Sequence, residues 1–343
     1  MEAWRTDPAF AMCRVLVDGA DLATFAGGPF DVRAVVATIR PETEHGPALD
    51  DVPWGNFPHG DTVREAVRQL YTDGGSVREA MGVLCGMCAD DSRAAAAVAV
   101  PFLIPVATDI HHPHRAEALG VLAGPARARH TGVASRGEFL LHRAGTQHEG
   151  HDDYDDYGVE VTGYPAGWSV AAARAALTTE TPALLPLLHD SDPATRIDAA
   201  YALATTADLD HTVRTALATR LITERDPMVR AALVLATAET TRAHPHPPTT
   251  TWIREQWQDR TQPPEVRLAA AIGWLCLTDE PAPDALHATV DALATGERAH
   301  AMGALPWMTA AAGAGEPGLL RCVRRMLHPE EPEPNDDPWA PLP

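Results

Sequence analysis

Three stretches in the C-terminal half of the chain share one pattern, and this pattern decides the fold class. They read DPATRIDAAYAL at residues 192–203, DPMVRAALVLAT at residues 226–237 and PPEVRLAAAIGW at residues 263–274. The arginines of successive stretches are 34 and 37 residues apart, close to the length of one helical hairpin. Recurrence at such a period indicates an array of helical repeats.

The first residues of these stretches have the chemistry of helix starts. Asp192 and Asp226 can accept hydrogen bonds from the free N–H groups of a first helical turn. Pro193 and Pro227 follow them and suit the first helical position, where no N–H is needed. Small and apolar residues then follow at helical spacing. Each stretch is therefore predicted to open a helix.

Apolar residues at helical spacing predict a second helix after each of these. The predicted second helices are residues 210–223, about 250–259 and 283–294. The stretch from His244 to Pro248 is interpreted as the turn between two helices of one unit. Each unit is then a helix, a short turn and a second helix, so we expect an all-α fold.

These units resemble the HEAT-repeat family of α-solenoids, whose repeats open with Asp-Pro-x-x-Arg, as residues 192–196 do. The resemblance covers roughly residues 168–295 and implies a right-handed superhelix of hairpins. It also implies that the aspartates and arginines form a ladder between neighbouring repeats, which gives a structural role to Asp192, Arg196, Asp226, Arg230 and Arg267. In the third unit Gln262 and Pro263 stand where the capping aspartate belongs, which leaves its ladder contact in question.

The rest of the chain divides around this array. Residues 1–128 are interpreted as degenerate helical repeats, with helices at 114–124 and at 92–108, the latter split into two near Pro101. Residues 129–166 lack periodicity and form an irregular acidic insertion. The HEAT-type repeats span 167–328, starting with a helix pair at 166–189. Residues 329–343 hold six prolines and five acids, the composition of a disordered tail.

The charge balance bears on partners. The 343 residues include 47 acidic and 27 basic side chains, the latter all arginine, and the formal net charge is −20. Because nucleic-acid binding depends on cationic side chains displacing counterions, this charge argues against a nucleic-acid partner. Residues 148–160 carry six acids without a base and could dock on a basic protein surface, or form a solvated loop. The insertion residues proposed for docking are Asp152, Asp153, Asp155, Asp156 and Glu160.

Membrane insertion and secretion are not expected. The longest apolar run, from Ala94 to Ala107, is shorter than the roughly 20 residues that span a membrane and contains two prolines. The N-terminus lacks the basic-then-apolar order of a signal peptide. Five cysteines, an odd number, do not suggest a disulfide framework. A cytoplasmic protein with reduced thiols is the expected outcome.

No motif supports a catalytic or metal site. Cys85 and Cys88 have C-x-x-C spacing, and His111, His112 and His114 follow, which could suggest zinc. The cysteines fit an apolar helix face better, and the histidines fit a polar turn before the next helix. Common nucleotide-binding, hydrolase and metalloprotease motifs do not occur in a fitting context. We therefore assign no catalytic residue, cofactor or metal.

The remaining functional candidate is the concave face of the array, lined by the second helix of each unit. The outward residues predicted to bind a partner are His211, Arg214, Thr215, Arg254, Glu255, Gln258, His287 and Asp291. The expected function is a non-catalytic binding or scaffold protein with a protein partner. The alternative is an enzyme that uses the groove as a pocket, as HEAT-like alkylpurine DNA glycosylases do, or for small-molecule chemistry. Masking of a basic toxin is a third possibility.

Overall fold

The described part of the chain is helical. The computed structural model describes residues 49–52, 54–71, 80, 82–84, 93–127, 168–207, 211–278, 280–309, 319, 320, 323 and 326–328, among which there are helices and no strand. The prediction of an all-α chain is therefore confirmed. The acidic insertion at 129–166, the tail at 329–343 and both Cys85 and Cys88 lie outside the described residues.

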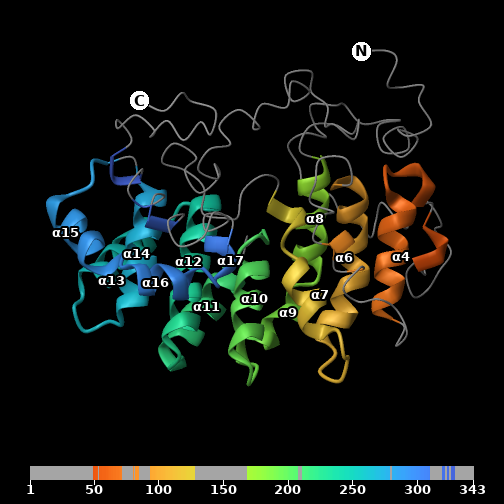
Figure 1. The fold of residues 1–343 in the computed structure, drawn as a ribbon, viewed down its shortest axis with the longest axis horizontal. Helices are drawn as coiled ribbons and strands as arrows, with labels where there is room; N and C mark the ends of the chain where they lie inside the picture. Colours follow the sequence, from red (N-terminus) through yellow and green to blue (C-terminus); the bar gives the residue numbers. More distant parts are fainter. Residues whose placement is uncertain are drawn as a thin grey trace, which may run out of the picture. The chain divides into compact units, whose positions relative to one another are not determined.

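Figure 1 shows the described helices, coloured in the order in which they follow along the sequence. The α-helices are α4 (Gly60–Leu70), α6 (Arg93–Thr108), α7 (Arg115–Val121), α8 (Trp168–Thr179), α9 (Thr181–Leu184), α10 (Pro193–Leu203), α11 (Thr212–Thr223), α12 (Pro227–Ala243), α13 (Pro247–Gln258), α14 (Pro264–Leu277), α15 (Asp284–Leu293), α16 (Gly296–Met302) and α17 (Pro306–Thr309). Short 3-10 helices are η3 (Leu49–Asp51), η4 (Trp54–Asn56), η5 (Pro125–Arg127) and η7 (Leu185–His189).

Helix starts and second helices agree with the sequence patterns. Helices α10, α12 and α14 begin at Pro193, Pro227 and Pro264, as predicted. The predicted second helices correspond to α11, α13 and α15. The turn predicted from His244 to Pro248 is shorter than expected, because α13 already begins at Pro247. Proline is well suited to the first helical turn, which explains the earlier start.

Helix α6 corrects one prediction. Residues 93–108 form a single helix with Pro101 and Pro105 inside it, so the predicted split near Pro101 is wrong. The two prolines are four residues apart and therefore lie on one face, which is partly exposed to solvent. The opposite face is buried and packs against α7 and α8, so these apolar contacts hold the helix continuous despite two missing N–H groups.

The described residues up to Val213 belong to one compact unit, in which α6 is central. Helices α4, α7 and α8 and the short η5 all pack against α6. The buried guanidinium of Arg127 lies over the Tyr201 ring, 3.4 Å from its centroid, and donates a 2.6 Å hydrogen bond to the Tyr201 carbonyl. This contact joins η5 to α10.

The described residues from Arg214 onward belong to the second unit, where α14 packs against α12, α13 and α15. A side chain at Gly273 would meet the Ala238 Cβ at 3.0 Å, so glycine permits the close approach of α12 and α14. Trp257 and Trp274 are buried and in edge-to-face contact. Trp252 is half-buried.

Candidate functional site

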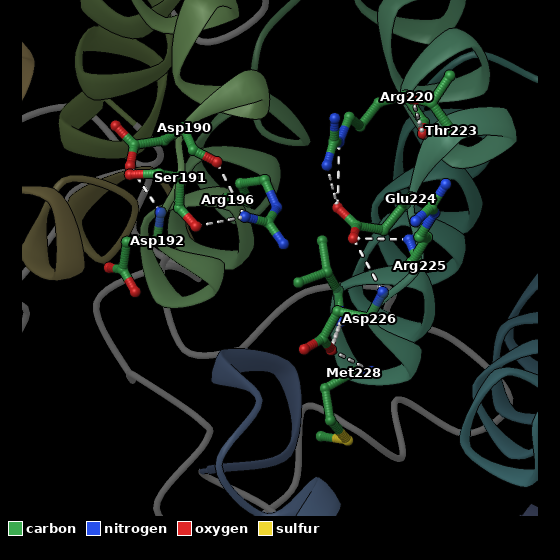
Figure 2. Close-up of polar contacts among 11 residues, drawn as sticks. Asp190, Ser191, Asp192, Arg196, Arg220, Thr223, Glu224, Arg225, Asp226 and Met228 are labelled. Carbon is green, nitrogen blue, oxygen red and sulfur yellow. Dashed lines mark hydrogen bonds and ion pairs between the residues drawn. The ribbon is translucent and has the colours of Figure 1, made fainter.

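The turn before α10 is organised by two aspartates (Figure 2). Asp192 accepts hydrogen bonds from the N–H groups of Ala194 and Thr195 at 3.3 and 3.1 Å, as predicted for a helix cap. Asp190 accepts the Asp192 N–H at 2.9 Å and an ion-pair hydrogen bond from Arg115 of α7 at 2.7 Å. The backbone bond from Asp192, followed by the contact with Arg115, lowers the pKa of the Asp190 carboxyl.

The turn before α12 repeats this construction with different side chains (Figure 2). Asp226 accepts the N–H groups of Met228 and Val229 at 2.8 and 3.1 Å. Glu224, whose side chain is 3% exposed, accepts the N–H groups of Arg225 and Asp226 and pairs with Arg220. Glu224 therefore occupies the same position in this turn as Asp190 does in the preceding one.

The turn before α14 also contains an acid that orders it, Asp259, but no side chain caps this helix. Asp259 accepts both the N–H and the hydroxyl of Thr261 and the side-chain amide of Gln262. Hydrogen bonds from Thr261 lower the pKa of the Asp259 carboxyl. Pro263 stands at the cap and provides no side-chain acceptor, as the sequence pattern indicated.

Arg230 of α12 contacts the turn before α14, where the sequence left the ladder contact in question. Gln262 in this turn accepts a 2.7 Å hydrogen bond from Arg230. Arg196 donates to the carbonyls of Asp190 and Ser191 in its own turn at 2.8 and 3.0 Å. Arg267 donates to the Trp257 carbonyl at 3.2 Å. Each of these arginines therefore bonds within the protein, and the ladder of capping aspartates and arginines stays a prediction.

Most guanidinium groups of the described residues are engaged inside the protein. Twelve arginines donate to carbonyl oxygens, carboxylates or a side-chain amide. They are Arg64, Arg68, Arg115, Arg127, Arg174, Arg196, Arg214, Arg220, Arg230, Arg242, Arg267 and Arg298. Arg93 is buried and also has a partner.

Three arginines of the described residues differ from these. Arg225, Arg254 and Arg260 are exposed, and within the described part of the chain no acceptor holds their guanidinium groups. Arg225 directly follows Glu224, Arg260 directly follows Asp259, and Arg254 lies on α13. All three belong to the unit that begins at Arg214. Among the described residues of this unit, these are the arginines that can offer positive charge to a partner.

The residues predicted to bind a partner lie on α11, α13 and α15, apart from His211 directly before α11, and differ in exposure. Exposed ones are His211, Thr215, Arg254, Glu255, Gln258 and Asp291. Arg214 is half-buried and donates to the His244 carbonyl at 3.1 Å, so it closes the end of α12. His287 is half-buried with its ring 5.1 Å from that of His328. Sequence periodicity missed Arg225 and Arg260, because both lie in turns; their shared position after an acid was the available signal.

Two of the three histidines considered for zinc, His112 and His114, have their rings in contact. His112 contacts the rings of both Tyr71 and His114 edge-on, and its Nδ1 accepts the His114 N–H at 3.2 Å. Within the ranges that the structure describes, no group of three or more His, Cys, Asp or Glu side chains could hold a metal ion. The same described residues include no helix long and apolar enough to cross a membrane.

Asp198 on α10 has a half-buried carboxyl. It lies against α7, where a Cβ built on Gly120 would be 3.9 Å from its Oδ2. No hydrogen bond to its carboxyl exists among the described residues. Burial, with a smaller effect from the negative charge of Asp192, raises the pKa of Asp198 to about 6. A carboxyl of this kind can exchange a proton near neutral pH.

The comparisons with known proteins give no relative. No family model, no curated protein and no solved structure matches this chain.

Proposed function

We propose that this chain is a non-catalytic scaffold, built as a right-handed HEAT-type solenoid, that binds a protein partner through its exposed turns and second helices. The observation that carries the proposal is the repeated turn before α10, α12 and α14. In each turn an acid, Asp190, Glu224 or Asp259, accepts the N–H of the residue two positions further on. Asp190 and Glu224 lie three residues before the helix start, and Asp259 lies five before it. Successive units with one construction are the hallmark of repeat proteins, which present extended binding surfaces.

The engagement of the arginines supports a protein partner over a nucleic acid. A nucleic-acid surface needs several cationic side chains free to neutralise phosphates. In the described residues, twelve guanidinium groups instead donate hydrogen bonds to internal acceptors, as Arg242 does to the Cys276 carbonyl. The net charge of −20 acts in the same direction. A cytoplasmic location is part of this proposal.

The test is a binding experiment with the full chain. The tagged protein is incubated at about 0.15 M salt with a cytosolic extract, and each recovered protein is then purified and titrated against the chain by calorimetry. A purified protein that forms a complex of fixed stoichiometry supports the scaffold. If no recovered protein binds the purified chain, or if the complex forms only through nucleic acid and is lost after nuclease treatment, the scaffold proposal is wrong.

One observation favours the alternative of an enzyme, namely the raised pKa of Asp198. General acids and bases commonly have such values because they exchange protons near the operating pH. The position of Asp198 between α10 and Gly120 of α7 also fits a purely structural group. Incubation of the chain and of an Asp198→Asn variant with a metabolite mixture separates these readings. Turnover that the variant loses would establish an enzyme, whereas equal composition of both mixtures argues against one.

A further inference from the structure

We propose that Ile222, Arg225 and Arg260, here called the turn surface, form a docking site for an acidic protein segment that carries an apolar side chain. This inference deepens the proposed function and rests on it. The three residues belong to the unit that begins at Arg214. They lie at the end of α11 and in the turns before α12 and α14.

The two arginines lie in neighbouring turns, Arg225 two residues before the start of α12 and Arg260 four residues before the start of α14. Each directly follows the acid that orders its turn, Glu224 or Asp259. The hydrogen bond from Arg230 to Gln262 joins the first turn of α12 to the turn before α14, so these turns are neighbours. Arg225 and Arg260 therefore lie in neighbouring turns of the same unit.

The acids beside these arginines do not hold their guanidinium groups. Both oxygens of Glu224 are occupied by the ion pair with Arg220 and by two backbone N–H groups. Asp259 likewise uses both oxygens, for bonds from Thr261 and Gln262. Because these carboxylates already have partners, the guanidinium groups of Arg225 and Arg260 can pair with carboxylates from another molecule.

Ile222 adds an apolar element beside this charge. It lies three residues before Arg225 and is 85% exposed, the highest exposure among the large hydrophobic side chains of the described residues. A partner that covers Ile222 gains from removing its apolar surface from water. A phosphate backbone offers no apolar group for this contact, so an acidic protein segment suits the turn surface better than a nucleic acid.

The spacing of the repeats suggests the pattern of the partner. Packed helices such as α12 and α14 lie about 8–10 Å apart, so we expect about this distance between the two turns that precede them. An extended peptide advances about 3.3 Å per residue, so acids three residues apart would span this separation. We therefore expect an acid-x-x-acid segment with an aliphatic residue next to it.

The experiment measures fluorescence anisotropy of labelled synthetic peptides with the full chain. The probe is an acid-x-x-acid peptide with a flanking leucine, and its matched control has the amides in place of the acids. The protein variants are an Arg225→Glu and Arg260→Glu double substitution, Ile222→Ser, and His300→Glu, which adds a negative charge at an exposed position on α16 in the same unit. Circular dichroism checks that all variants are folded.

The expected result is saturable binding of the acidic probe and at least about tenfold weaker binding of the amide control. The double variant loses at least about tenfold in affinity, Ile222→Ser about threefold, and His300→Glu less than about twofold. No saturation at about 1 mM probe, equal losses in His300→Glu and the double variant, or tighter arginine-dependent binding of a single-stranded oligonucleotide would each overturn the inference.

The outcome is separable from that of the scaffold proposal. A purified partner that binds the double variant as tightly as the original chain leaves the scaffold intact and rejects the turn surface. The absence of any partner in the extract experiment rejects the scaffold by itself.

Discussion

Asp198 shows how a single residue can make stability depend on pH. Its folded pKa of about 6 is above the ordinary value of 3.8, because burial disfavours the charged carboxylate. A group of this kind contributes stability that is complete below pH 3.8 and is lost as the pH rises through 6. At neutral pH the ionised side chain therefore opposes folding.

We predict that Asp198→Asn raises the free energy of unfolding at pH 8 by about 2 kcal/mol and changes it by less than about 0.5 kcal/mol at pH 4. The neutral amide has nearly the shape of the protonated acid but never ionises. Urea denaturation at the two pH values measures the difference. Asp291→Asn on exposed α15 is the control and should have little effect at either pH. Equal destabilisation by Asp198→Asn at both pH values would contradict the prediction.

The capping aspartates provide a second prediction for single residues. Asp226→Ala removes the acceptor of the Met228 and Val229 N–H groups and should lower the free energy of unfolding by about 1 kcal/mol. Asp226→Ser should restore most of it, because serine is also an effective cap. Thermal denaturation followed by circular dichroism gives the comparison. If alanine and serine at this position are equally stable, capping by Asp226 is energetically unimportant.

At the scale of an element, each helix start depends on the turn before it. Glu224 shows this most clearly, since its buried carboxylate binds two N–H groups of the turn and the guanidinium of Arg220 on α11. The end of one helix and the start of the next are thus fixed by one side chain. Asp190 has a similar role, with Arg115 of α7 as its cationic partner.

We predict that Glu224→Ala lowers the free energy of unfolding by about 3 kcal/mol, because it leaves Arg220 without its carboxylate in a partly buried position. Asp259→Ala in the turn before α14 is the comparison and should cost less, since Asp259 bonds to neutral groups of its own turn. Chemical denaturation of both variants tests the order. A larger loss for Asp259→Ala would show that the buried ion pair adds little.

Helix α6 is an element that its local sequence did not predict. Proline removes a backbone donor wherever it occurs, so Pro101 favoured a break when judged from its neighbours alone. The helix continues because its other face is buried against α7 and α8. A local rule was overridden by packing with elements that are distant in sequence.

At the scale of the whole molecule, several carboxyls make the fold sensitive to acid. Hydrogen bonds that Asp190 and Asp259 accept lower their pKa values. For Asp192, burial raises the pKa, but bonds from Thr195 and Ala194 outweigh it and the net pKa is lowered. Groups with lowered pKa values contribute stability that is present above the ordinary pKa of 3.8 and lost as the pH falls below it.

We therefore predict that the free energy of unfolding decreases as the pH falls below about 4. Asp190→Asn should be less stable than the original chain at pH 7, and the two should converge toward pH 2. Urea denaturation between pH 2 and pH 7 measures both curves. A constant difference between them over this range would show that protonation of Asp190 does not contribute.

The sequence by itself determined that the described part of the chain is helical and where α10, α12 and α14 begin. Asp192, Asp226 and the prolines after them act through hydrogen bonds within three residues, so their roles can be read from the order of residues. The tertiary structure decided that α6 continues through its two prolines and that Asp198 is half-buried. It also decided which arginines bond to internal acceptors and which stay exposed. These features depend on side chains that lie 30 or more residues away, as the contacts of Arg115 with Asp190 and of Arg230 with Gln262 show. Burial and charge pairing are set by such distant neighbours, and the order of residues does not reveal them until the chain has folded.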